Sequence, residues 1–575
     1  NFQDYSLKVT PTQISAGPFS LPRLAGPQMT VPFSLEAPTS ALNAMRVLRA
    51  MRALKPILIE GPPGAGKTSL ITALANICNV RLARLNLSEQ TDLTDLFGQD
   101  QPLTEPGQFA WRSAPFLRAM EQGEWVLLDE MNLAPQQVLE GLNACLDHRG
   151  EAFVPELNRT FKKHPEFRVF AAQNPQAQGG GRKGLPKSFV SRFTCVYVDQ
   201  LNEEDLALIS SCTHPNISVS LRSQLSSYIE ALENWSTDRV MPGQPFEFNL
   251  RDTLRWLDLL TSNESMSPVK YLPMIVLQRL RTAEDRNHAE NLLNQYLPDA
   301  SSVRQQINPV VITPGSFCVN EAALLRSEKQ YEHSSELAVL SIQQPLLESM
   351  IWGIQQAWPI LLVGPSGSGK TSMIRLLSKL SGSRLHEFAI TADLDASDLL
   401  GEFDQVEKEA EWYRMWKKIG SIINGVDIAE AELVDAVRAK NLANLERLLS
   451  KNHPCYELVK ETVEKYTKER FDLPKFKWFD GMLVSAIENG DWVVLDNANL
   501  CAPSVLDRLN SLLERNGKLY INECSDSDGN PRVITPHPNF RMFMTVNPKF
   551  GELSRAMRNR SVELWTGDLV TRTPT

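Results

Sequence analysis

The sequence has no long apolar run, no closely paired cysteines and no excess of positive charge. None of its apolar runs approaches the roughly 20 residues needed to cross a bilayer, which argues against a membrane-spanning helix. The eight cysteines are scattered without a C-x-x-C pair, and the eight histidines show no metal-ligand spacing. In the absence of a signal-peptide pattern, reduced cysteines in the cytosol or nucleus are expected rather than a disulfide framework. The net charge of −9 argues against a chain-wide nucleic-acid surface.

The bulk composition is that of an ordinary globular protein. Hydrophobic residues make up 42% and charged residues 22% of the chain. At 575 residues the chain is too long for one core, so several domains are expected. The sequence does not begin with Met, which suggests a piece of something longer.

Four sequence blocks occur twice in the same order. The pairs are GPPGAGKTSLI (61–71) with GPSGSGKTSMI (364–374), FAWRSAPFLRAMEQGEWVLLDEMNLAP (109–135) with FKWFDGMLVSAIENGDWVVLDNANLCAP from Phe476, FRVFAAQNP (167–175) with FRMFMTVNP (540–548), and, more loosely, LPKSFVSRF (185–193) with LSRAMRNRS (553–561). Because the four blocks follow the same order in both copies, this is a duplicated domain rather than chance similarity.

The repeat also predicts how the chain is divided. The predicted parts are a lead-in (1–55), a first α/β core (56–199), a helical lid (200–300), a second lead-in (301–358) and a second α/β core (359–565) without a lid after it. Lys67 and Asp129 are 62 residues apart, whereas Lys370 and Asp496 are 126 apart. The extra 64 residues lie mainly within 404–475 and show helical spacing of apolar residues. This insertion is either a packed helical hairpin or a docking surface for a partner or neighbouring domain.

The stretch ILIEGPPGAGKTSLI combines an apolar strand, a glycine-rich turn and a helix start, so G-x-x-x-x-G-K-[ST] is a strong phosphate-binding signal here. Glycines let backbone N–H groups curve around phosphates, and the helix adds its positive end. Lys67 is expected to meet the β- and γ-phosphates of ATP and Thr68 to hold Mg²⁺. The residues assigned to ATP in this copy are Gly61, Pro62, Pro63, Gly64, Ala65, Gly66, Lys67, Thr68 and Ser69.

Further candidates follow the strands of the first copy. WVLLDE places Asp129 and Glu130 at the carboxyl end of a buried strand. Asp129 is expected to bind Mg²⁺, directly or through water, and Glu130 to take a proton from the attacking water. Asn174 ends the next strand and would position water beside the γ-phosphate. Arg192 and Arg251 are candidates for neutralising charge in the transition state.

The second copy has lost one of these groups. Its assigned ATP-binding residues are Gly364, Pro365, Ser366, Gly367, Ser368, Gly369, Lys370, Thr371, Ser372, Asn497 and Asn547, with Thr371 and Asp496 directed to Mg²⁺. Asn497 stands where the first copy has Glu130, and an amide cannot accept a proton at neutral pH. The second site is therefore predicted to bind ATP and hydrolyse it slowly, unless Glu402 or another carboxylate supplies the base.

Together these motifs resemble the AAA+ ATPases, in the branch that carries a hairpin inserted in the second helix and that includes MoxR ATPases, dynein and midasin. LLDEMNLAP, GGGRKGLPKSFVSRF, DNANLCAPSVLDRLNSLLERNG and FNLRDTLRW look most like the midasin family, whose members carry six AAA+ modules in one chain. The resemblance covers nearly the whole sequence, and the third and fourth modules are favoured.

The resemblance implies a ring in which nucleotide sits between adjacent modules. Arg560, aligned with Arg192, would then act on ATP at the first site, with Arg558 as a close rival, and Arg192 would serve a preceding module. Arg251 matches the lid arginine called sensor 2, acting on its own or a neighbouring site. The family relation also implies ATP or ADP with Mg²⁺ as ligands, removal of assembly factors from pre-60S ribosomal particles, and a nucleolar and nucleoplasmic location.

Other functions remain open on the sequence. A dynein-like motor would need a stalk coiled coil, and neither copy has one. A nucleotide-gated scaffold, in which ATP only sets the shape of the ring, is supported by Asn497 and opposed by Glu130. A nucleic-acid translocase is disfavoured by the negative net charge and by the lack of an aromatic–basic stripe.

Overall fold

The computed structural model describes residues 7–26, 37–62, 64–87, 91–102, 109–173, 185–237, 246–263, 266–297, 309–326, 339–405, 419, 459, 476–515, 517–525 and 531–567. Pro63 and Asn174, both predicted site residues, lie outside the described residues. So does the predicted insertion over 404–475, apart from 404, 405, 419 and 459.

Two five-stranded parallel sheets carry the two copies of the repeat. In the first, the strands lie in the order β12 (Thr194–Tyr197), β4 (Ile57–Glu60), β11 (Arg168–Gln173), β8 (Trp125–Asp129) and β5 (Leu82–Asn86). In the second, they lie in the order β24 (Val562–Trp565), β16 (Ile360–Val363), β23 (Arg541–Val546), β20 (Trp492–Asp496) and β17 (Leu385–Ala389). Equivalent strands occupy equivalent places, so the prediction of tandem α/β modules is confirmed.

The central strands are continuous apolar runs because both faces of a parallel sheet are covered by helices. The helices of the first core are α1 (Pro38–Met51), α2 (Lys67–Cys78), α3 (Leu93–Phe97), α4 (Pro115–Gln122), α5 (Gln136–Leu146) and α6 (Lys187–Val190). In the second they are α12 (Gln344–Gln355), α13 (Lys370–Ser381), α14 (Ala396–Leu400), α19 (Met482–Asn489), α20 (Pro503–Asp507) and α21 (Arg555–Arg560). The carboxyl end of each strand is thus left open for polar residues.

A three-stranded antiparallel sheet precedes each core. The first contains β1 (Leu7–Val9), β2 (Gln13–Ala16) and β3 (Phe19–Pro22), and the second contains β13 (Val311–Ile312), β14 (Ser316–Val319) and β15 (Ala322–Leu325). The Pro- and Gly-containing lead-ins of the two copies therefore form the same small element. In the second core, β21 (Leu519–Ser525) and β22 (Pro531–Ile534) form a strand pair, as β9 (Glu151–Val154) and β10 (Arg159–Lys162) do in the first.

A second compact unit comprises residues 99–112 and 400–481. It contains the antiparallel pairs β6 (Gly98–Pro102) with β7 (Phe109–Ser113) and β18 (Gly401–Gln405) with β19 (Phe476–Asp480). Phe403 and Trp478 pack edge to face on the latter pair, with ring centroids 5.2 Å apart. These strand pairs stand where the resemblance places the hairpin inserted in the second helix.

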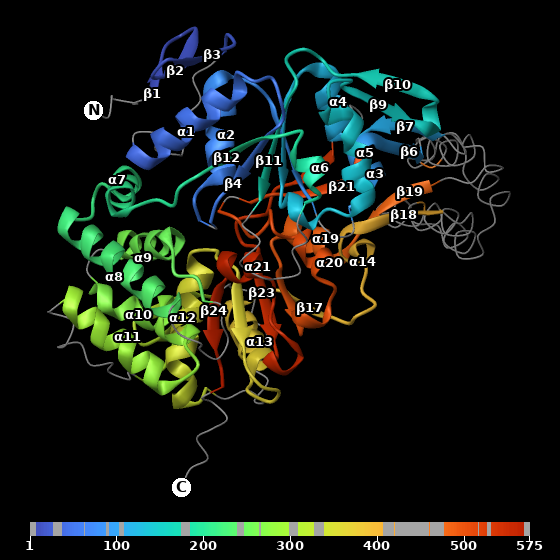
Figure 1. Cartoon of the computed structure of the whole chain (residues 1–575). Helices are drawn as coiled ribbons and strands as arrows, with labels where there is room; N and C mark the ends of the chain where they lie inside the picture. The colour runs from blue at the N-terminus through green and yellow to red at the C-terminus, as the bar shows by residue number, and fades with distance from the viewer. Residues whose placement is uncertain are drawn as a thin grey trace, which may run out of the picture. The chain divides into compact units, whose positions relative to one another are not determined.

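The lid consists of α7 (Glu203–Thr213), α8 (Val219–Thr237), α9 (Leu250–Ser262), α10 (Leu272–Ile275) and α11 (Ala283–Tyr296). Its buried hydrophobic side chains from α8 onward share one cluster with the second core, in which Tyr271 of the lid packs on Trp352 of α12 at a centroid distance of 4.9 Å. The first core has a separate cluster around Ile57 and Phe170. In Figure 1, α10 of the lid accordingly lies against α12 and β24 of the second core, whereas α7 packs on α1 of the first core. None of the described helices is long and apolar enough to span a bilayer.

Candidate active sites

The glycine-rich loop of the first copy is shaped for an anion. Gly64 and Gly66 adopt φ of +82° and +73°, the left-handed region that glycine enters without steric cost, and α2 begins at Lys67 directly after them. The Lys67 ammonium donates to the carbonyls of Gly61 and Pro62 at 2.8 and 2.9 Å. The loop, the helix N-terminus and the lysine therefore converge as phosphate binding requires.

Oxygen ligands suited to Mg²⁺ lie beside this loop. The Thr68 hydroxyl donates to Asp129 Oδ2 at 3.0 Å, and Arg84 of β5 reaches the same oxygen at 3.0 Å. Mg²⁺ prefers a few such oxygens and completes its shell with water and substrate phosphates, so this donor set fits it. Among the residues that the structure describes, there is no cluster of three or more His, Cys, Asp or Glu for a metal held by protein alone.

Glu130 occupies an unusual backbone position directly after β8. Its φ and ψ are 54° and 45°, a left-handed conformation that asparagine tolerates better than glutamate. Asn497 in the second copy has nearly the same angles, 56° and 48°. The two residues therefore share a backbone conformation and differ in the chemistry of their side chains.

The second site repeats the geometry of the first. Lys370 donates to the carbonyls of Gly364 and Pro365, both at 2.8 Å, and burial lowers the pKa of its ammonium against the opposing charge of Asp496. Thr371 donates to Asp496 Oδ1 at 3.0 Å. In both copies, therefore, the loop lysine donates to two loop carbonyls, and the threonine after it donates to the aspartate at the strand end.

Neighbours of the acidic strand end differ between the copies. Thr545 of β23 donates to Asp496 Oδ1 at 2.6 Å and accepts from the Asn497 backbone N–H at 2.9 Å. The first copy has Ala172 at that position of its repeat and brings Arg84 to its aspartate instead. Asp496 is therefore held by two neutral hydroxyls, whereas Asp129 is held by one hydroxyl and one cation.

Asn547, predicted at the end of the third strand, lies beside the second loop. It is buried, and its amide donates to Ser366 Oγ at 3.0 Å. The remaining assigned loop residues, Ala65, Ser69, Gly367, Ser368, Gly369 and Ser372, all lie in the two loop–helix turns. These positions agree with the assignment to ATP, which stays a prediction.

Arg558 and Arg560, the two candidates for the arginine that acts on ATP at the first site (the arginine finger), have different surroundings on α21. Arg558 is buried and forms a two-pronged ion pair with buried Glu563 at 2.9 and 3.0 Å, which holds its pKa above the usual range against the effect of burial. Arg560 instead reaches Glu514, at 3.2 Å, beside Arg84 of the first site. The surroundings favour Arg560 as the finger. Arg192, its counterpart, follows α6 and donates to the Ser188 carbonyl.

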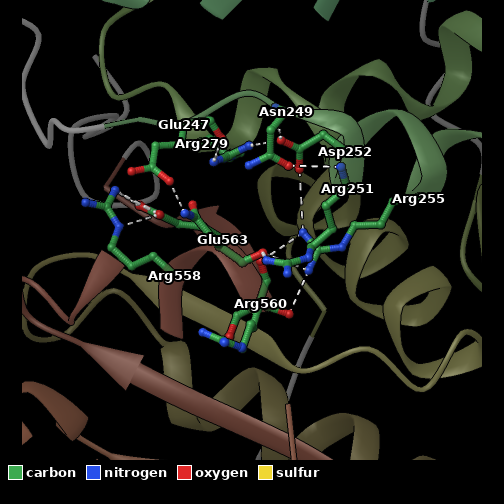
Figure 2. Close-up of polar contacts among 11 residues, drawn as sticks. Glu247, Asn249, Arg251, Asp252, Arg255, Arg279, Arg558, Arg560 and Glu563 are labelled. Carbon is green, nitrogen blue, oxygen red and sulfur yellow. Dashed lines mark hydrogen bonds and ion pairs between the residues drawn. The ribbon is translucent and has the colours of Figure 1, made fainter. Parts of the chain in front are cut away.

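Arginines of the lid hold the end of α21, as Figure 2 shows. Arg251 Nη1 donates to the Asn559 carbonyl at 3.0 Å. Arg255, one turn further along α9, donates to the carbonyls of Arg560 and Ser561 at 2.6 and 3.1 Å. Burial lowers the pKa of Arg255 to about 10, in spite of the nearby Asp252 carboxylate. The lid thus caps the helix that presents Arg560.

Replacing Arg255 with methionine is expected to destabilise this junction. The substitution keeps an unbranched stem but removes the charged donor, and each buried carbonyl left unsatisfied costs roughly 1–3 kcal/mol. We expect a lower midpoint in chemical denaturation. Arg49 of α1, an exposed arginine of the first core, provides the control, because Arg49→Met should leave the midpoint unchanged. An unchanged midpoint for Arg255→Met would contradict the capping role.

Comparison with known proteins agrees with this architecture. The sequence profile of the AAA domain (dynein-related subfamily) matches residues 56–193, 359–419 and 438–560, more than half of the chain. The chain belongs to the dynein-related AAA ATPase family. The profile of the midasin AAA lid domain matches residues 205–298 of this AAA ATPase, over α7–α11.

Two midasins are among the similar proteins. The midasin of Dictyostelium discoideum is 37% identical in an alignment 644 positions long, gaps included, which covers 95% of this chain and 11% of that protein. The midasin of Giardia intestinalis is 33% identical in an alignment of 634 positions, which covers 92% of this chain and 13% of that protein. An uncharacterized protein of Staphylococcus epidermidis is 30% identical over 158 residues, 27% of this chain and 59% of its own length. The predicted resemblance to midasin is confirmed, and the chain spans about a tenth of the two midasins.

Several residues at the sites of this AAA ATPase were not predicted from the sequence. Arg84, Glu514 and Thr545 carry no motif of their own, and they meet the site only because strands and modules pack together. Arg255 offered a weak signal, since it lies four residues after Arg251 in FNLRDTLRW and so on the same helix face.

Proposed function

We propose that the first site hydrolyses ATP and that the second binds ATP and hydrolyses it slowly. The observation that carries this proposal is the pair Glu130 and Asn497. The two residues have nearly the same backbone angles, and each belongs to a site with the same lysine, threonine and aspartate. Membership of an ATPase family supplies the reaction, and the two side chains supply the difference between the sites.

At the first site each group has a separate task. The loop and Lys67 hold the phosphates, and Thr68 and Asp129 would hold Mg²⁺, which neutralises phosphate charge when bound. Glu130 accepts a proton from the water that attacks the γ-phosphate. Arg560 of the second module stabilises the charge that develops on the transferred phosphoryl group. Asn174 is proposed to orient the attacking water.

At the second site the same reaction lacks its proton acceptor. Asn497 can donate or accept a hydrogen bond but cannot take the proton. In addition, the Thr545 hydroxyl donates a 2.6 Å hydrogen bond to Asp496 Oδ1. We infer that bound ATP persists there and keeps this module in one conformation while the first site turns over, so the second site acts as a nucleotide-gated scaffold.

Nucleotide retention tests the division of labour. After incubation with ATP and rapid desalting, the intact protein is expected to retain unhydrolysed ATP at the second site, and Lys370→Ala should release it because the phosphates lose their cation. Lys379→Ala, on the same helix α13, is the control and should retain the nucleotide. If the retained nucleotide is ADP, or if Lys370→Ala changes nothing, the proposed second site is wrong.

The wider role follows from similarity to the midasin family. We propose that this segment, within a six-module ring, drives removal of assembly factors from pre-60S ribosomal particles in the nucleolus and nucleoplasm, with contacts to those factors made by other regions. Cells that carry Glu130→Gln should accumulate pre-60S particles with assembly factors still attached. Normal particle maturation in such cells would contradict this role.

A further inference from the structure

A chain of alternating charges connects the first site to the arginine of the second module. Arg84 lies 3.0 Å from Asp129 Oδ2 and extends its other guanidinium nitrogen to Glu514, at 3.1 Å. Glu514 Oε1 in turn lies 3.2 Å from Arg560 Nη2 and 3.4 Å from Nε. The order is therefore acid, base, acid, base, from the Mg²⁺ ligand to the proposed finger.

Glu514 is the shared member of this chain. Burial alone would raise the pKa of Glu514, but Arg84 and Arg560 outweigh it and hold the pKa below the usual range. Asp129 and Glu514 likewise raise the pKa of Arg84, against the effect of burial. One carboxylate therefore offsets two arginines that would otherwise repel each other.

Comparison of the two copies shows that this arrangement is specific to the first site. The equivalent of Arg84 in the second sheet is Glu387, since each pairs with the same position of the neighbouring strand, and Glu387 binds Arg375 of its own module. The equivalent of Glu514 is Asp147, which binds its own Arg149 at 2.6 Å. Only Glu514 among these acids bridges the two modules in the described residues.

We propose that Glu514 is a positioning residue that acts on the first site from the second module, by holding Arg560 and Arg84 together at the edge of that site. The inference deepens the proposed function and rests on it, since it assumes that Arg560 serves ATP bound at Lys67. Glu514 does not touch the reacting atoms. It sets the place from which Arg560 reaches them.

This role has a kinetic signature. Without the carboxylate, Arg84 and Arg560 keep their charge and still attract ATP, so KM should not rise. Their orientation is lost, however, and misplacement of a catalytic group by about 1 Å can cost roughly 100-fold in rate. Loss of a merely structural contact would instead weaken the interface on which the nucleotide lies and raise KM.

The test is steady-state ATP turnover of the intact protein, corrected for other sites by the turnover of Lys67→Ala. Glu514→Gln is expected to lower kcat roughly 10- to 100-fold without raising KM, and Glu514→Asp should recover part of kcat because it restores the charge. Glu488→Gln is the matched control: Glu488 pairs with Arg532 at 3.0 Å on the surface of the same module and should leave both constants unchanged. Wild-type kcat in Glu514→Gln, or a rise in KM alone, overturns the inference.

A double-mutant cycle with Arg560→Ala shows whether Glu514 acts through that arginine. If it does, Glu514→Gln should cause little further loss once Arg560 is gone, whereas independent effects would multiply. Multiplying effects overturn the inference even if each single variant is slow. If Glu130→Gln and Arg560→Ala both turn over like wild type, the proposed function itself fails, which distinguishes that outcome from a failure confined to Glu514.

Discussion

Replacing Glu130 with glutamine is expected to lower ATP turnover at the first site by about 10²- to 10⁴-fold, the usual contribution of a positioned general base. The amide keeps the size of the side chain but cannot take the proton. Binding should survive, because Lys67, Thr68 and Asp129 are untouched. The measurement is steady-state turnover of the intact protein with the Lys67→Ala rate subtracted, alongside equilibrium nucleotide binding.

Two further variants make this result specific. Glu140→Gln changes an exposed glutamate on α5 of the same module and should turn over like wild type. Glu130→Asn copies the second site and should be as slow as Glu130→Gln. It should also unfold at a higher temperature, because asparagine accepts the left-handed conformation at less cost, by up to about 1 kcal/mol. Turnover unchanged in both Glu130 variants would place hydrolysis elsewhere.

Arg560→Ala is expected to lower turnover at the first site by roughly 10³-fold or more, the range in which an arginine supplied in trans contributes to phosphoryl transfer. Its side chain is 18% exposed and is held mainly by Glu514, so its loss should change the stability of the fold little. The measurement is corrected turnover together with the thermal unfolding midpoint of the same preparation.

Arg558→Ala on the same helix provides the contrast. It leaves Glu563, whose side chain is 2% exposed, with only the more distant Arg281, at 3.8 Å, and breaking a buried pair typically costs about 3–5 kcal/mol when no other partner remains. We therefore expect Arg558→Ala to lower the unfolding midpoint markedly, and Arg560→Ala to lower the rate at nearly unchanged stability. The reverse pattern would make Arg558 the finger.

The sequence predicted the parts of each site that lie close together in the chain. The loop before Lys67 and the strand that ends at Asp129 are local patterns, and their repetition at Lys370 and Asp496 predicted two matching α/β cores. Apolar runs, glycines and a helix start determine these elements without help from the rest of the fold.

Contacts between distant segments could not be predicted in this way. Arg84, Glu514 and Arg560 come from a strand, a turn after a short helix and the end of another helix, and nothing in their local sequence favours contact between them. Thr545 is visible as a threonine where the first copy has Ala172, but its bond to Asp496 depends on the neighbouring positions of β23 and β20. Such contacts depend on tertiary packing, which a single sequence does not reveal.

The hydrophobic cluster shared by the lid and the second core sets a limit on how the protein can be divided for laboratory work. A fragment that ends near residue 300 would carry Trp256 and Tyr271 without the second-core side chains, including Trp352, that belong to the same cluster. A fragment that starts there would expose the opposite half, and large exposed apolar patches promote aggregation. A soluble fragment is therefore expected to need the lid together with the module after it, even though the sequence repeat groups the lid with the module before.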